Sequence, residues 1–213
     1  MADTYRKTEP EGLSPAEALA LLEKHTRVAQ HDLATRTDAG EDVLHYLAKN
    51  GAPATRQAVA ANPAASARSN RLLADDAESG VRVELARKIG RLFPGLLEVE
   101  QKQLRDLTIA TLERLARDQE VAVRAILSEE IKHHDCVPKR VVKRLANDEE
   151  LSVCVPVIEF SPVLEDKDLI ELVTAARASS VLTAVARRKD LSGNVSEAVA
   201  IRLDVPSMTT TTS

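Results

Sequence analysis

Apolar residues recur along the chain at the three- and four-residue spacing of amphipathic helices, and short polar stretches interrupt them at intervals. Four segments align without a gap on a Leu-Ala or equivalent pair: YLAKNGAPATRQAVA, LLADDAESGVRVELA, RLARDQEVAVRAILS and RLANDEELSVCVPVI. In each segment, we expect one helix to end just after this pair and a second helix to begin beyond a short polar turn. The pattern therefore predicts a series of helix pairs.

One apolar position in each predicted pair serves as an anchor that measures the repeat. The anchors are Leu47, Leu73, Leu115, Leu145, Leu172 and Val199. Successive anchors are 26, 42, 30, 27 and 27 residues apart. Periods of this length with helical patterning are typical of solenoids. The longer step contains Phe93-Pro94-Gly95, where we expect a helix to end, and then one long amphipathic helix at roughly 98–117.

The connections between pairs carry helix stop and start signals. Prolines in NPAA and SPVL are expected to end the outgoing helices, and Ser66 and Ser192 to cap the incoming ones. Leu164 and Leu169 have the spacing of a hydrophobic staple. The connections thus agree with the helix pairs that the apolar pattern predicts.

These patterns predict an all-α fold in which residues 13–205 form one helical repeat domain. Ser14 as a cap and Pro15 at the first helical position predict an N-terminal capping helix within about 13–38. We expect residues 1–12 and the Thr/Ser tail at 206–213 to be disordered.

Composition supports this fold and limits the classes of function. Hydrophobic residues make up 44% of the chain but aromatic residues only 2%, so the core must consist of Ala, Leu, Val and Ile, which let helices approach closely. A net charge of -4 gives no general attraction to nucleic acid or to an anionic membrane. The polar N-terminus and the absence of a long apolar run predict a cytoplasmic protein without a membrane segment.

A polar pair repeats at fixed positions around the predicted turns. The pairs are Asn50 with Arg56, Asp76 with Arg82, and Asp118 with Arg124, each six residues apart. The next segments replace the arginine by Cys154 and Leu182. Two interpretations remain open for Arg56, Arg82 and Arg124: structural pairing with an Asp or a helix C-terminal carbonyl, or a row that binds anions on a concave face.

The motif Leu-x-x-Leu-Ala-x-Asp-x-x-x-x-x-Arg resembles the HEAT repeat, in which the Asp and Arg form a ladder from unit to unit. The stretch RLANDEELSVCVPVIEFSPVLEDKDLIELV, followed by AVARRKDLSGNVSEAVA, is similar to a large alphaproteobacterial family catalogued only as a domain of unknown function with HEAT-like repeats. The resemblance covers roughly residues 45–205 and supplies no catalytic residues. We therefore expect a right-handed α-α superhelix, a HEAT-like repeat solenoid of about five units.

A predicted helix at PKRVVKRLA places its basic residues opposite Val141, Val142 and Leu145. The basic residues are Lys139, Arg140, Lys143 and Arg144. This face fits a solvated outer surface, a binding surface for an acidic protein partner, or a nucleic-acid contact. Interleaved aromatic residues and Gly-rich phosphate loops are missing, so nucleic acid is the least favoured of the three.

The sequence KHHDC contains His133, His134 and Cys136 and raises the question of a metal site. Adjacent histidines on a helix point about 100° apart, and no second His/Cys cluster supplies further ligands. Nothing at a recognisable spacing activates Cys136 as a nucleophile. Because the common catalytic motifs are also missing, we expect no enzyme activity, no catalytic residues, no metal and no cofactor.

The expected function is a non-catalytic scaffold or adaptor that binds another protein on the surface built by its repeats. Arg56, Arg82, Arg124 and the four basic residues of 139–144 are the candidate partner-binding residues. The alternative is a HEAT-like module that binds nucleic acid through this basic face. Self-association through an apolar C-terminal edge beyond Val199 is a further expectation.

Overall fold

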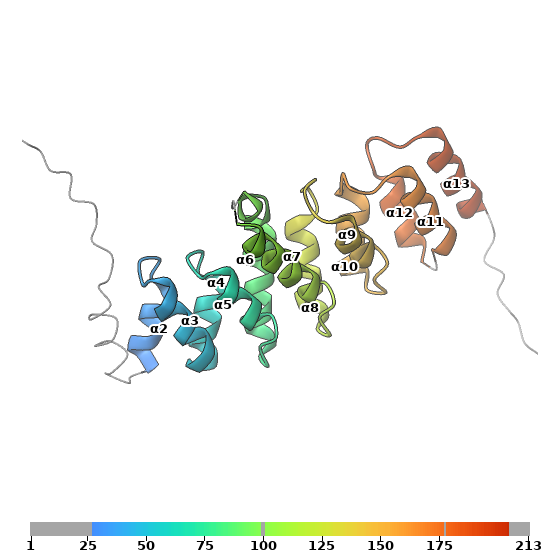
Figure 1. The fold of residues 1–213 in the computed structure, drawn as a ribbon. Helices are drawn as coiled ribbons and strands as arrows, with labels where there is room; N and C mark the ends of the chain where they lie inside the picture. Colours follow the sequence, from blue (N-terminus) through green and yellow to red (C-terminus); the bar gives the residue numbers. More distant parts are fainter. Residues whose placement is uncertain (1–26, 99–100, 177, 205–213) are drawn as a thin grey trace, which may run out of the picture. The chain divides into compact units, whose positions relative to one another are not determined.

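The computed structural model describes residues 27–98, 101–176 and 178–204, and within these ranges the regular secondary structure is entirely helical (Figure 1). The helices are α2 (Arg27–Thr35), α3 (Glu41–Asn50), α4 (Pro53–Ala61), α5 (Ala67–Leu73), α6 (Ser79–Leu97), α7 (Lys102–Leu115), α8 (Val121–Ile131), α9 (Lys139–Ala146), α10 (Leu151–Phe160), α11 (Asp166–Ala175), α12 (Ser179–Ala186) and α13 (Gly193–Asp204). The all-α prediction is confirmed for this part of the chain.

The aligned segments form helix pairs joined by short turns, as predicted. The repeated Asp fixes three of these turns, because its carboxylate accepts the backbone N–H two residues later. Asp76 Oδ1 accepts the Glu78 N–H at 2.9 Å, and Asp118 Oδ1 accepts the Glu120 N–H at the same distance. Asp148 repeats the arrangement in the turn between α9 and α10. The repeated Asp therefore shapes its own turn in addition to any ion pair that it forms.

The chain divides into two compact units, Met1–Lys88 and Ile89–Ser213, and the division falls within α6. In the first unit, α2 packs on α4, and α3 packs on both α4 and α5. In the second, α10 packs on both α8 and α12, while α11 packs on α13. Alternate helices are thus neighbours within each unit.

The repeated apolar positions form the core. All six anchors are buried: Leu47, Leu73, Leu115, Leu145, Leu172 and Val199. The valines that open the second helices, Val81, Val123 and Val153, are buried as well. The core is therefore built almost wholly from aliphatic side chains, and Phe93 is its largest fully buried member.

The capping serines in the connections between the helix pairs act as predicted. Ser66 accepts the Ser69 N–H at the start of α5, and Ser192 accepts the Val195 N–H at the start of α13. Leu164 and Leu169 are both buried beside the first turn of α11.

The longer step between the anchors Leu73 and Leu115 differs from its prediction at two points. Helix α6 does not end at Phe93-Pro94-Gly95 but continues through Pro94 to Leu97. Pro94 lies near the end of the helix, where it removes a single backbone hydrogen bond, and the fully buried Phe93 beside it anchors this turn. The following helix starts later than expected, at Lys102, because Gln101 is extended.

Some expectations concern residues outside the described ranges. These are the disordered segments at 1–12 and 206–213 and the part of the capping helix that would begin at Ser14. Within the predicted capping segment at about 13–38, the helix among the described residues is α2. Within the described ranges, every helix is too short or too polar to span a lipid bilayer.

Candidate functional site

Arg56 joins two helix pairs of the first unit. Its Nε and Nη2 donate to Asp76 Oδ2 and Oδ1 at 2.6 and 2.9 Å, a bidentate pair. Its Nη1 donates to the carbonyl of Gly51 in its own turn at 3.0 Å. The carboxylate partner thus comes from the turn of the following pair, whereas the carbonyl comes from the arginine's own turn.

Arg124 repeats this geometry in the second unit. Its Nε and Nη2 donate to Asp148 Oδ2 and Oδ1 at 2.7 and 3.0 Å, and its Nη1 donates to the Asp118 carbonyl at 2.7 Å. Burial alone would raise the pKa of Asp148, but hydrogen bonds from Arg124 and the Glu150 N–H lower it. The ion pair is held at both turns, so it behaves as a structural rung between consecutive pairs.

Arg82 is buried, with only 4% of its surface exposed. Its Nη1 donates to the carbonyls of Asp76 and Ala77 at 2.7 and 3.2 Å. The three arginines of the repeat therefore share one contact, a hydrogen bond to a carbonyl of their own turn. This arrangement favours the structural interpretation of Arg56, Arg82 and Arg124.

The basic face of α9 is largely matched by carboxylates. Lys139 forms ion pairs with Glu165 and Asp168 at 2.9 and 2.8 Å. Lys143 pairs with the same Asp168 at 3.0 Å and with Glu171 at 2.9 Å. The two lysines thus tie α9 to α11 and its N-terminus.

The two arginines of α9 lie apart from this cluster. Arg140 forms an ion pair with Glu113 on α7. Arg144 is exposed and lies close enough to Asp148 to help lower the pKa of that carboxyl. Of the four predicted basic residues, Arg144 is the one for which no hydrogen bond or ion pair joins its side chain to a described residue.

Asp168 is the centre of the cluster between α9 and α11. It completes a capping box with Glu165, because its Oδ2 accepts the Glu165 N–H at 3.0 Å. Burial raises its pKa, but the hydrogen bonds from Lys139, the Glu165 N–H and Lys143 outweigh burial and bring the pKa to about 2. The carboxylate therefore remains charged at neutral pH and holds both lysines.

A second series of cross-pair contacts was not anticipated from the sequence. Asn62 Nδ2 donates to the carbonyls of Ala34 and Arg36, each at 2.8 Å, at the end of α2. Lys88 Nζ donates to the Asn62 carbonyl at 3.0 Å and to Asn70 Oδ1 at 2.7 Å. In each case, a side chain of a later helix, or of the residue that follows it, donates to a backbone carbonyl at the end of an earlier helix.

The same contact recurs in the second unit. Arg188 donates to the carbonyls of Ile158 and Ser161 at 2.7 and 3.0 Å, at the end of α10. Asn62, Lys88 and Arg188 each lie six residues after the repeat position held by Arg56, Arg82 and Leu182. The shared register was a usable signal, but the three different residue types concealed it.

The KHHDC stretch lies at the end of α8 and in the following turn. The His133 ring packs against Phe160 with ring centroids 5.2 Å apart, and Lys132 lies over the same ring. Cys136 is exposed. In the part of the chain that the structure describes, no three His, Cys, Asp or Glu side chains are arranged to hold a metal ion.

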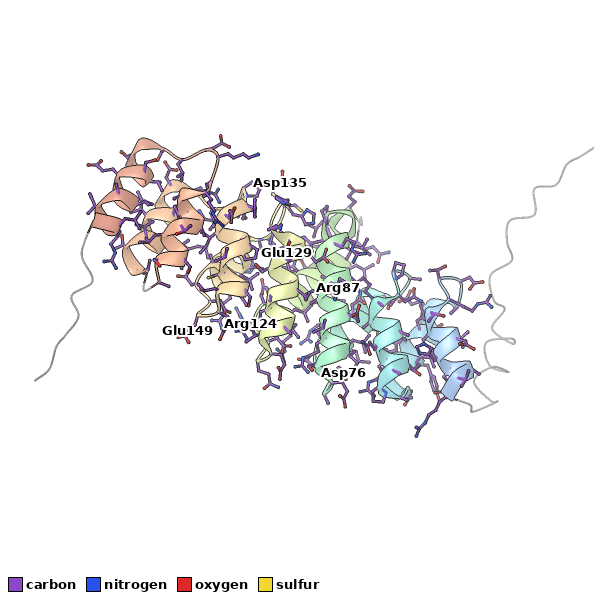
Figure 2. The ribbon with its side chains drawn as sticks, turned by 180° about the vertical axis from the view of Figure 1, so that it is seen from behind. Asp76, Arg87, Arg124, Glu129, Asp135 and Glu149 are labelled. Atoms are coloured by element: carbon purple, nitrogen blue, oxygen red, sulfur yellow. The ribbon has the colours of Figure 1, made fainter. Side chains whose placement is uncertain are left out.

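The α7–α8 and α9–α10 turns lie at one edge of the second unit, which we call the turn edge, and two cavities lie along it. One, of about 390 Å³, is lined by Asp118, Arg124, Arg144, Asn147, Asp148, Glu149 and Glu150. The other, of about 440 Å³, lies between the α9–α10 turn and the α11–α12 connection and contains Cys154. Figure 2 shows Arg124 and Glu149 at this edge and Asp135 at the opposite edge. This edge is the candidate functional site.

The comparisons with known proteins concern the C-terminal part of the chain. Residues 153–213 match the sequence model of a family described as "Uncharacterised protein conserved in bacteria (DUF2336)". No curated protein and no solved structure matches the chain. The match confirms that the C-terminal part is similar to a bacterial family of unknown function, and it includes α11 to α13 and most of α10.

Proposed function

We propose that the chain is a non-catalytic scaffold that binds another protein, and that its helix pairs are HEAT-like repeats of a right-handed solenoid. The observation that carries this proposal is the rung formed by Arg56 with Asp76 and repeated by Arg124 with Asp148. The same bidentate contact joins consecutive pairs at the same repeat position in both units. Such nearest-neighbour contacts are what a stack of equivalent repeats requires.

The packing order gives further support. Helix α10 contacts the second helices of the preceding and following pairs, α8 and α12, and α3 contacts the first helix of the next pair, α5. In a solenoid, first helices form one layer and second helices another. The resulting turn edge presents similar residues at successive turns, which suits recognition of an extended partner.

The chemistry of the turn edge favours a protein partner with basic groups. Glu120, Glu149 and Glu150 are exposed at the turns of the second unit. Beside them lie two cavities, and the one that contains Cys154 has a mixed apolar and polar lining. A mixed surface of this kind fits side chains of a protein better than it fits a uniform polyanion.

The proposal assigns no catalytic role to the ionisable residues around the cavities. Arg124 and Asp148 are fixed to each other, and Cys154 is buried with its pKa raised chiefly by burial. A nucleophile or general base needs the opposite arrangement, with an activating partner and access to a substrate.

Nucleic-acid binding receives little support from the basic face. Lys139, Arg140 and Lys143 already contact carboxylates, so binding a phosphate backbone would require those ion pairs to be broken. Self-association has one observation in its favour, because Ile201 and Leu203 on α13 are 59% and 55% exposed.

The test is affinity capture from a nuclease-treated cytosolic extract, followed by mass spectrometry of the bound proteins. The variant Glu149→Lys/Glu150→Lys reverses the charge of the turn edge, and Glu197→Lys on exposed α13 is its matched control. We expect a discrete partner to bind the wild type and the control and to be lost from the edge variant. Recovery of nucleic acid alone from an untreated extract would overturn the proposal.

A further inference from the structure

The cavity of about 440 Å³ occupies the place where the next arginine rung would lie. The residues that line it include Asp148, Glu149, Leu151, Cys154, Leu172 and Val181. Val181 has the repeat position of Val81, Val123 and Val153, which are buried, yet it is only half-buried. The lower burial of Val181 indicates that the junction between the α9–α10 pair and the α11–α12 pair is incompletely packed.

The alignment of the repeats explains the cavity residue by residue. At the preceding junction, Arg124 on α8 meets Asp148, which lies three residues after the anchor Leu145. At this junction, Cys154 replaces the arginine, and Ala175, three residues after the anchor Leu172, replaces the aspartate. Both members of the rung are therefore missing, and both replacements line the cavity.

The acceptors that served the arginine are nevertheless still present. Arg124 donates to the carbonyls of Asp118 and Gln119 in its own turn, at 2.7 and 3.2 Å. The equivalent carbonyls belong to Asp148 and Glu149, which also line the cavity. Among the described residues, no donor forms a hydrogen bond with either carbonyl. The junction thus keeps the acceptor half of the arginine site without the arginine.

Other contacts in the same unit show that carbonyls alone can hold a guanidinium here. Arg188 donates to two backbone carbonyls of the α10 end, and Arg202 Nη2 donates to the Ala176 carbonyl at 3.0 Å. The electrostatic environment also favours a cation, because Asp148 and Glu149 are the charged side chains among the described residues that line the cavity. Leu151, Leu172 and Val181 offer apolar walls for an aliphatic stem.

We propose that this cavity receives an arginine side chain of the protein partner, which completes the rung that Cys154 and Ala175 leave open. The inference rests on the proposed adaptor function and specifies the chemistry that the partner presents. The guanidinium donates to the carbonyls of Asp148 and Glu149, its charge faces the exposed carboxylate of Glu149, and its stem lies against the apolar walls. Arginine is preferred over lysine because its planar fork supplies several donors at once.

Methyl NMR of the purified full-length protein tests the site without a known partner. The probe is N-acetyl-arginine amide at millimolar concentration, and N-acetyl-norleucine amide, with an apolar side chain and no guanidinium, is the matched control. We expect the arginine probe to shift the methyl signals of Leu151, Leu172 and Val181 and to bind at least about tenfold more tightly than the control. Equal binding of both compounds, or no shift with either, overturns the proposal.

Two variants test the assigned atoms. Cys154→Arg/Ala175→Asp rebuilds the rung within the chain, so it should raise the melting temperature and abolish the shifts caused by the arginine probe. Glu149→Gln changes only an exposed side chain, and we expect it to weaken probe binding severalfold while the fold is retained. Unchanged probe binding in Glu149→Gln, or in a folded Cys154→Arg/Ala175→Asp variant, contradicts the proposal.

The sequence places Arg177 between two lining residues, so an Arg177→Ala variant completes the set. Probe binding of equal strength with and without Arg177 supports an external occupant, whereas binding seen only in Arg177→Ala would assign the cavity to the chain's own arginine and overturn the proposal. Partner capture remains a separate question. If the arginine probe fails to bind but a partner protein is still captured, this inference alone is refuted. If the probe binds but no protein is captured, the adaptor function is refuted.

Discussion

Arg124 and Asp148 come from consecutive helix pairs and are joined by two parallel hydrogen bonds of 2.7 and 3.0 Å. Asp148 at the same time accepts the Glu150 N–H and thereby fixes its own turn. One carboxylate thus sets a local turn and a contact between pairs, which explains why the sequence repeats it.

Replacing Arg124 with Met should lower the free energy of unfolding by about 2–3 kcal/mol, because the largely buried Asp148 carboxylate loses its partner. Urea unfolding followed by circular dichroism measures the change. Arg117→Met is the matched control, because Arg117 is exposed in the turn between α7 and α8, and it should change the free energy of unfolding by less than about 0.5 kcal/mol. Equal effects of the two substitutions would show that the rung contributes no specific stability.

Asp168→Asn should reduce stability at neutral pH by about 1–2 kcal/mol, because both lysines of α9 lose a charged partner. The folded pKa of about 2 lies below the ordinary value of 3.8, so the wild-type carboxylate contributes stability above pH 4. That contribution is lost as the pH falls from about 4 to 2. Chemical unfolding across this range should therefore bring the wild type and the variant together, and a constant difference would exclude Asp168 as the cause.

The buried Lys88 should make stability depend on pH in the alkaline range. Burial lowers its pKa from 10.5 to about 7, so between these values the unfolded chain binds more protons than the folded chain. Stability should then rise with pH from about 7 to 10 in the wild type more than in Lys88→Met. Denaturant unfolding at several pH values measures the difference, and parallel profiles would mean that folded Lys88 keeps an ordinary pKa.

Gly90 permits a close approach of α6 and α8 within the second unit. A Cβ atom added at Gly90 would lie 2.7 Å from Glu130 Cβ, whereas one added at Gly95 meets nothing within 4 Å. Gly90→Ala should therefore destabilise the protein by about 1–3 kcal/mol. Gly95→Ala is the matched control and should be neutral or stabilising by up to about 1 kcal/mol, since alanine favours helix. Thermal unfolding compares them, and equal behaviour would argue against the close packing.

The sequence was sufficient for the helix pairs, their turns and their core positions. Each of these features depends on local chemistry: a three- to four-residue apolar period, an Asp that binds its own turn, and Ser66 or Ser192 as a cap. The end of α6 was misjudged, because the buried Phe93 outweighs the local effect of Pro94. Where local preference and packing disagreed, packing prevailed.

The candidate site could be predicted only in part. Sequence spacing located the arginines and the basic face, but it could not show that Lys139 and Lys143 meet Asp168, or that Arg124 meets an aspartate 24 residues away. Nor did the replacement of an arginine by Cys154 by itself indicate a cavity. The residues that form each turn are close together in the sequence, so the sequence alone predicts the turns. Ion pairs between helix pairs, and cavities between them, depend on how consecutive pairs pack, because the side chains that meet there come from distant parts of the chain.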